Sequence, residues 1–116
     1  PIVGNNIGYV THVYPNYKPH TWDKLFGDAA AKIPMIITEW GWSSAESSED
    51  SLLFGSADSY GQPLRGYLDA RPQIGWTAWS YDPRCGPAML GRDKDMGDFV
   101  KKWLKDIQRL RTKAVP

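Results

Sequence analysis

The strongest constraint on the fold is the stretch at residues 35–42, where an apolar run ends in a glutamate that is followed by two tryptophans. Pro34 precedes this run and Gly41 closes it, so its short length and β-branched residues predict a buried strand rather than a helix. Glu39 would then lie at the carboxyl end of the strand. Burying a carboxylate is costly, so Glu39 is either paired, for example with an arginine, or used in chemistry. The surrounding indoles favour the second interpretation.

Two further strands are predicted, at residues 7–13 and 74–80. The first is followed by a helix capped by Thr21, and a second helix begins near Pro63. A third helix, capped by Asp93 or Asp95, carries an apolar stripe formed by Met96, Phe99, Val100, Trp103, Leu104, Ile107 and Leu110.

This alternation of strands and helices predicts an α/β fold with parallel strands. Three strands are too few to close a barrel, and a parallel sheet needs both of its faces covered. We therefore expect residues 1–116 to form a single partial domain that needs a missing amino-terminal portion or a partner chain.

Charge and cysteine content exclude several function classes. Lys and Arg total 14 against 13 for Asp and Glu, a net charge of +1 that gives no basis for binding nucleic acid or an anionic membrane. No apolar run is long enough to span a bilayer, so we expect a soluble chain. The single cysteine, Cys85, excludes an intrachain disulfide and a Cys-rich metal site. We expect a packed thiol there, the alternative being a bond to a cysteine elsewhere.

Side chains suited to sugar chemistry lie where the predicted strands end. His12 and Tyr14 end the first strand, Glu39 ends the second, and Trp79 and Asp82 follow the third. Carboxyl ends of parallel strands carry the active sites of (β/α) barrels. Tryptophan, of which the chain has six, stacks well on sugar rings and also fills cores.

Together these segments resemble glycoside hydrolase family five, the retaining cellulases and mannanases of a larger barrel clan. The matching motifs are His12-x-Tyr14, Thr38-Glu39-Trp40-Gly41 and Trp76-Thr77-Ala78-Trp79-Ser80. The resemblance implies that these are the sixth, seventh and eighth strands of a TIM (β/α)8 barrel, so that the chain is its carboxyl-terminal part.

The resemblance also implies roles for individual residues. Glu39 would be the nucleophile that forms a covalent glycosyl-enzyme, and Tyr14 would donate a hydrogen bond that keeps Glu39 ionised. His12 would line the sugar site and Trp79 would form its stacking floor. The implied substrate is a β-linked polysaccharide such as cellulose, another β-glucan or mannan, without metal or cofactor, and the implied location is extracellular.

Structural alternatives remain open for each of the other candidates. His12 could be an ordinary structural histidine, and Trp79 could fill the core, as we expect of Trp76 and Trp103. Trp42 could contact a more distant sugar from its loop. Asp82 could bind substrate or cap its own loop, and the second interpretation is favoured.

One part of the family pattern is missing. The family carries its acid/base glutamate in an Asn-Glu pair, which this sequence lacks, and Glu46 and Glu49 lie in a serine-rich loop unsuited to a desolvated proton donor. The chain would therefore supply the nucleophile, and a partner barrel segment would supply the acid. The alternatives are a non-catalytic carbohydrate-binding chain and a structural half-barrel that self-associates through open sheet edges.

Overall fold

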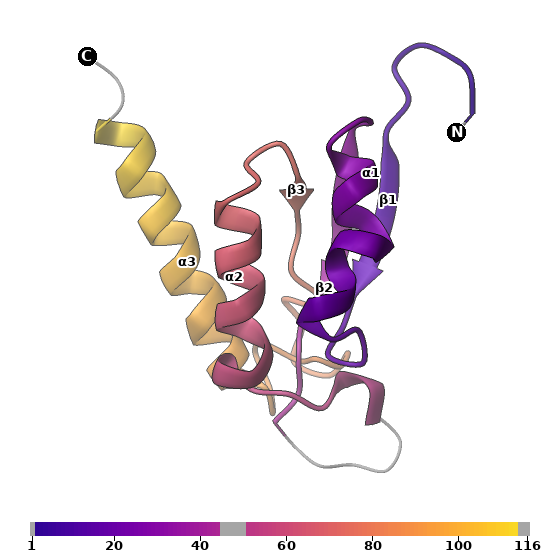
Figure 1. Ribbon diagram of the computed structural model, residues 1–116. Helices are drawn as coiled ribbons and strands as arrows, with labels where there is room; N and C mark the ends of the chain where they lie inside the picture. Colours follow the sequence, from indigo (N-terminus) through magenta and orange to yellow (C-terminus); the bar gives the residue numbers. More distant parts are fainter. Residues whose placement is uncertain (1, 45–50, 114–116) are drawn as a thin grey trace.

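The computed structural model describes residues 2–44 and 51–113. Three strands of these residues form one parallel sheet in the order β1-β2-β3 (Figure 1). The strands are β1 (Tyr9–Val13), β2 (Met35–Trp40) and β3 (Gly75–Trp76). Both strand pairs are parallel, which confirms the predicted α/β fold.

The third strand is shorter than predicted, because regular pairing covers two residues of the expected seven. The chain nevertheless keeps contact with β2 beyond this point. Thr77 N donates to Ile37 O and Trp79 N to Trp40 O, both at 2.9 Å. This irregular continuation carries Trp79 to the end of the sheet where β1 and β2 also finish.

The first helical segment begins earlier than predicted. It consists of a 3-10 turn (Pro19–Thr21), a π-helical turn (Asp23–Gly27) and α1 (Asp28–Ala30). Thr21 therefore lies inside the segment instead of capping it, and its hydroxyl donates to Lys18 O at 2.7 Å. Pro19 begins this helical segment, because the first turn of a helix does not use the backbone N–H that proline lacks.

The second helix also starts before the predicted position. A π-helical turn (Ala57–Gly61) leads directly into α2 (Gln62–Asp69). Ser56 caps this turn, because its hydroxyl accepts from Ser59 N while Ser59 Oγ accepts from Ser56 N. This reciprocal capping box satisfies backbone donors that a start at Pro63 would leave unused.

The third helix, α3 (Lys94–Lys113), follows Asp93 directly. Asp93 is fully buried, and its carboxylate accepts from Ser43 Oγ at 2.6 Å and Ala88 N at 2.7 Å. Asp93 thus joins the loops that follow β2 and β3. Asp95 lies in the first turn and accepts from Trp42 Nε1 at 3.2 Å.

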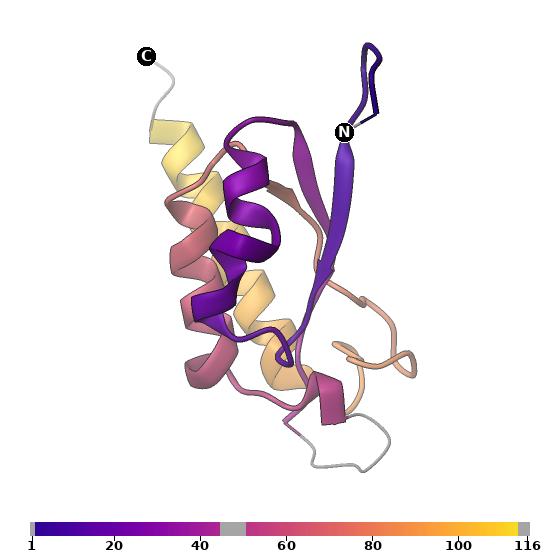
Figure 2. The same ribbon diagram turned by 45° about the vertical axis from the view of Figure 1, so that its right-hand side comes forward.

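The helices cover one face of the sheet and leave the other open (Figure 2). The core between the layers is aromatic, with Trp22, Trp40, Trp42 and Trp103 at most 1% exposed. On the open face, Val10 and Ile36 are register partners and remain 64% and 44% exposed.

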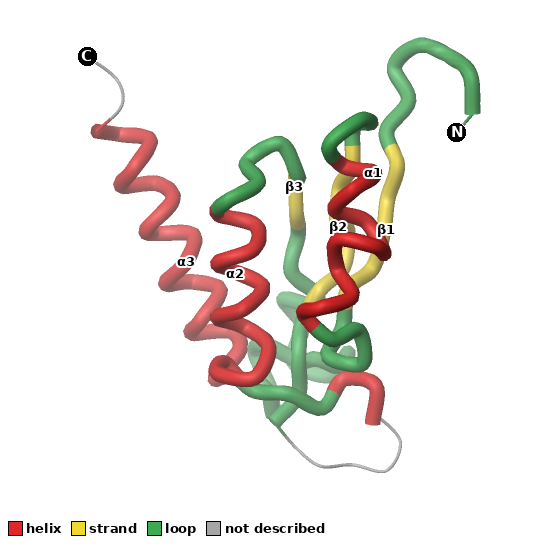
Figure 3. Tube along the Cα trace, viewed as in Figure 1, coloured by secondary structure: helices red, strands yellow, loops and turns green. Residues whose placement is uncertain are grey.

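The apolar stripe of α3 is only partly buried. Met96, Val100 and Trp103 lie in the core, but Leu104 and Leu110 are exposed. The helix α3 runs past the end of α2 (Figure 3). Within the described ranges, none of the helices has the length and apolar character needed to cross a membrane.

Candidate active site

The ends of β1 and β2 bring three of the predicted site residues together. The Tyr14 hydroxyl donates to Glu39 Oε2 at 2.9 Å, and His12 Nδ1 lies 3.3 Å from the same oxygen. The Glu39 side chain is 27% exposed and that of His12 is 52% exposed. Glu39 is therefore held by two neighbours while remaining accessible from outside.

A register shift determines which way Glu39 points. Thr11 pairs with Ile37, but His12 pairs with Glu39, so β2 contains one residue more than β1 at this step. Without the shift, Thr38 would lie opposite His12, and Glu39 would lie beside the buried Val13. A bulge of this kind re-aims a side chain locally. Here it places the carboxylate on the same face as His12.

Tyr14 is suited to remain a hydrogen-bond donor. Burial, followed by its hydrogen bond to Glu39 and the negative charge of that carboxylate, raises the pKa of Tyr14 well above its usual value. The phenol therefore keeps its proton at neutral pH. The backbone of β1 beside it is fixed by the buried Tyr60, whose hydroxyl donates to Val13 O.

The backbone of Trp79 lies beside the end of β2. Its N donates to Trp40 O at 2.9 Å, and the residue is 39% exposed. The approach of the two segments depends on Gly41, where a Cβ atom would lie 2.6 Å from Trp79 O. The peptide bond between Trp79 and Ser80 is cis.

Trp42 does not occupy the position expected of a sugar contact. It is 0% exposed, its Nε1 donates to Asp95, and its ring makes an edge contact with Phe99 at 5.2 Å between centroids. This burial leaves no face free for a ligand, and we assign Trp42 to the core.

Asp82 stabilises its own loop. Its Oδ1 accepts hydrogen bonds from Arg84 N and Cys85 N, both at 2.7 Å. The bond from Cys85 N, followed by the bond from Arg84 N, lowers the pKa of the Asp82 carboxyl. The favoured loop-capping interpretation agrees with these contacts. Cys85 itself is exposed, so the expectation of a packed thiol is wrong.

The sequence did not indicate that Asp93 and Ser43 join the loops at this end of the sheet. The sequence suggested Asp93 only as a helix cap, and no motif in the sequence pointed to a role for Ser43. Glu46 and Glu49 lie outside the described residues. Within the described residues, no three His, Cys, Asp or Glu side chains are grouped so that they could hold a metal ion.

The fold matches solved structures of a β-glucanase from Saccharophagus degradans, SdGluc5_26A. The native form aligns with a TM-score of 0.73 at 24% sequence identity, and the complex with cellotetraose aligns with the same score at 23% identity. Each match covers 89% of this chain and 35% of the β-glucanase chain. No protein-family model matches the sequence, and no curated protein matches it significantly.

At this identity the likeness concerns the fold. The chain has three parallel strands with their helices, arranged like about a third of the matched β-glucanase chain. It therefore spans about a third of the length of the solved structures that it matches. This agrees, at the level of the fold, with the resemblance carried by the three sequence motifs.

Proposed function

We propose that this chain is the carboxyl-terminal part, about strands six to eight, of a (β/α)8-barrel retaining glycoside hydrolase, and that it supplies the nucleophile Glu39. The observation that carries this proposal is the approach of Tyr14 and His12 to one oxygen of Glu39 at the carboxyl ends of parallel strands. The likeness of the fold to a β-glucanase solved with cellotetraose supports it.

The proposed reaction has two steps. Glu39 attacks the anomeric carbon, and the glycosidic C–O bond breaks as the departing oxygen takes a proton from a second carboxylic acid. Water then attacks the same carbon, gives a proton to that second group and releases Glu39. A retaining mechanism places the two carboxyl groups roughly 5 Å apart. The second group belongs to the remaining barrel segment.

The neighbours of Glu39 receive distinct roles in this mechanism. Tyr14 keeps the carboxylate ionised and aimed through its 2.9 Å hydrogen bond. His12 lines the sugar site, and Trp79, which is 39% exposed, forms a stacking floor. Asp82 orders the loop that follows Trp79. We propose a β-linked glucan or mannan as substrate and an extracellular location, where such polymers occur.

The decisive experiment concerns Glu39 in the complete barrel, by which we mean this chain together with the strands that complete it. Glu39→Gln keeps the shape of the side chain but removes the nucleophile, so turnover should fall by several orders of magnitude while substrate still binds. Asp82→Asn is the control, because its carboxylate bonds to its own loop and should matter far less.

An independent measurement identifies the nucleophile by mass. A fluorosugar that traps the covalent intermediate should add its mass to the peptide that contains Glu39. Labelling of Asp82, Glu46 or Glu49 instead would contradict the assignment. If the complete barrel binds cello-oligosaccharides but Glu39→Gln leaves every measured property unchanged, the chain is a binding element rather than a catalytic one.

A further inference from the structure

Asp93 is a buried carboxylate that the proposed reaction does not use. It is 0% exposed and lies just before α3. Burying such a group is costly unless hydrogen bonds replace the lost water. Its Oδ1 accepts from Ser43 Oγ at 2.6 Å, and its Oδ2 accepts from Ala88 N at 2.7 Å. Arg92 Nε lies 3.5 Å from Oδ2 and supplies a positive charge. The carboxylate therefore connects two loops that are far apart in the sequence.

Ser43 fixes one end of this connection to the strand that carries Glu39. It lies in the loop just after β2 and is 0% exposed. Its backbone N donates to Leu53 O at 2.8 Å, and its O accepts from Gly55 N at 3.0 Å. Because backbone bonds hold this residue on both sides, its hydroxyl is a fixed point relative to the end of β2.

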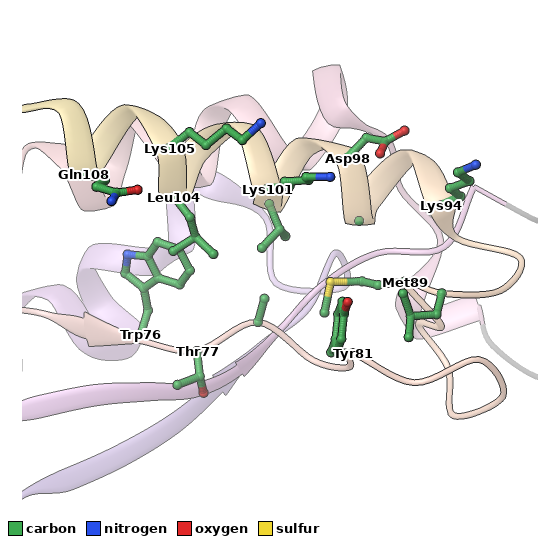
Figure 4. A pocket seen from close by; sticks show the side chains of 14 residues that line it. Trp76, Thr77, Tyr81, Met89, Lys94, Asp98, Lys101, Leu104, Lys105 and Gln108 are labelled. Atoms are coloured by element: carbon green, nitrogen blue, oxygen red, sulfur yellow. The ribbon is translucent and has the colours of Figure 1, made fainter.

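Ala88 fixes the other end of the connection to Trp79. Ser80, the residue after Trp79, donates from its N to Pro87 O at 2.9 Å and accepts at its O from Met89 N at 3.2 Å. Ser80 is thus bonded to both neighbours of Ala88. Met89 in turn packs against the first turns of α3 (Figure 4). A movement of Ala88 would therefore be passed on to the backbone beside Trp79.

A direct backbone contact closes these bonds into one network. Trp79 N donates to Trp40 O at 2.9 Å, and Trp40 follows Glu39 in β2. We call this closed set of contacts the Asp93 network, and its members are Trp40, Ser43, Asp93, Ala88, Ser80 and Trp79. Each bond in a closed network limits the movements that would break the others, so the network holds its members more firmly than a single contact would.

The bonds of the Asp93 carboxylate differ from those of an ordinary helix cap. A capping side chain accepts from backbone N–H groups in the first turn of its own helix. Both oxygens of Asp93 instead accept from the loops that follow β2 and β3. The carboxylate therefore serves the connection between the two loops rather than the start of α3.

We propose that Asp93 is a positioning residue for the candidate active site. Through Ser43 and Ala88 it fixes Trp79 relative to Glu39, so that a sugar stacked on Trp79 meets the nucleophile at the correct distance and angle. The inference rests on the proposed function and adds a residue that touches neither substrate nor the reacting atoms. A misplacement of about 1 Å can lower turnover roughly 100-fold, so a small movement of the network is enough to matter.

The kinetic test uses the complete barrel and a soluble β-glucan. Ser43→Ala cuts the network at one bond and leaves the backbone bonds of Ser43 in place. The value of kcat per active site should fall about tenfold or more while KM changes less than about twofold, because sugar still stacks on Trp79 but meets Glu39 in the wrong geometry. The fluorosugar that traps the intermediate counts the active sites.

Tyr67→Phe is the matched control for Ser43→Ala. It also removes a hydroxyl that donates to a carboxylate, in this case Asp23 at 2.7 Å, but it does so on α2 and outside the Asp93 network. Neither kcat nor KM should change in this variant. The comparison separates the loss of the network from the loss of one hydrogen bond elsewhere in the fold.

A double-mutant cycle separates positioning from simple destabilisation. Once Trp79→Ala has removed the stacking surface, Ser43→Ala has no stacked sugar to misplace, and its effect on kcat should shrink to less than about twofold. A residue that only stabilised the fold would have the same effect whether or not the indole of Trp79 is present.

Hydrogen exchange tests the network without any reaction. Ser43→Ala should speed exchange at the amides of Ser80 and Ala88, whereas Tyr67→Phe should not. Asp93→Asn should keep both exchange and turnover near normal, because its amide can accept from Ala88 N and donate to Ser43 Oγ.

Three results would overturn the proposal. These are an unchanged kcat or unchanged amide exchange in Ser43→Ala, an equal effect of Ser43→Ala with and without the indole of Trp79, and a large loss of turnover in Asp93→Asn. A failure of the nucleophile assignment looks different. It would appear as unchanged turnover in Glu39→Gln, while the amide exchange of Ser43→Ala would still be faster.

Discussion

At the scale of single residues, the contact between Tyr14 and Glu39 makes a specific kinetic prediction. Tyr14→Phe removes one hydrogen bond to an ionised carboxylate, and such bonds contribute about 1.5–3 kcal/mol. In the complete barrel, kcat/KM should therefore fall by about 10- to 100-fold, less than for Glu39→Gln. Steady-state kinetics on a soluble β-glucan measures both variants under the same conditions.

A matched control for this prediction is Tyr17→Phe. Tyr17 lies in the turn just after β1 and is 42% exposed. Removing its hydroxyl should leave the kinetic constants unchanged. If Tyr14→Phe behaves like Tyr17→Phe, the hydrogen bond seen in the structure does not contribute to turnover.

Tyr67 predicts how the chain responds to alkaline pH. Burial first, and then its 2.7 Å hydrogen bond to Asp23, raise the pKa of Tyr67 to about 12. Since an unfolded tyrosine titrates near about 10, the folded protein holds this proton more tightly, and the resulting stabilisation is complete below about pH 10 and is lost as the pH rises towards 12. Phenolate absorbance should show a late titration that Tyr67→Phe removes and Asp23→Asn shifts to lower pH.

The sequence predicted which residues of the candidate site lie together, because strand ends in a parallel sheet share one edge. That rule is enough to bring His12, Tyr14 and Glu39 near one another. It does not reveal the register shift, because an alternating pattern carries no mark of one extra residue. It also misplaced Trp42, since a tryptophan after a strand looks the same in sequence whether its ring faces solvent or the core.

At the scale of elements, the types and order were predictable but the boundaries were not. Apolar spacing located α1, α2 and α3, whereas the true starts of the first two helical segments depend on Pro19 and on the serine pair at Ser56 and Ser59. Such local contacts override the pattern. The length of the third strand was overestimated, because apolar residues continue along the sequence after regular pairing with β2 has ended.

Two tryptophans on different elements should give different kinds of defect. Trp103 on α3 is 0% exposed and stacks on Trp76 at 4.2 Å between ring centroids, so Trp103→Ala should lower the free energy of unfolding by about 3–5 kcal/mol. Trp79→Ala removes a partly exposed ring and should weaken substrate binding by about 10- to 100-fold with a smaller loss of stability.

Thermal unfolding and oligosaccharide titration of the complete barrel separate these two effects. Binding constants for Trp103→Ala should be compared at a temperature where the variant is still folded. If Trp79→Ala lowers the melting temperature but leaves binding and turnover unchanged, Trp79 belongs to the core and the stacking floor lies elsewhere.

At the scale of the whole molecule, one covered sheet face and two free edges explain why the sequence predicted an incomplete fold. Counting three strands was sufficient to expect a partial domain. The structure adds that α1, α2 and α3 lie on the same side of the sheet, so the second face is left to whatever completes the sheet (Figure 2). Which face that would be could not be predicted, because β1 and β2 carry apolar residues on both faces.

The open face of the sheet leads to a prediction about self-association. In isolation the chain should self-associate, because Val10 and Ile36 lie side by side in register with 64% and 44% of their surfaces exposed. Replacing both with lysine adds two like charges to that surface and should shift the chain towards monomer in light scattering, whereas Leu110→Lys on the far end of α3 should not. No variant of the isolated chain should hydrolyse glycans, since the proposed acid belongs to the missing segment. A monomeric wild-type chain with a sharp unfolding transition and glucanase activity would contradict both the open-face prediction and the assignment of this chain as part of a barrel.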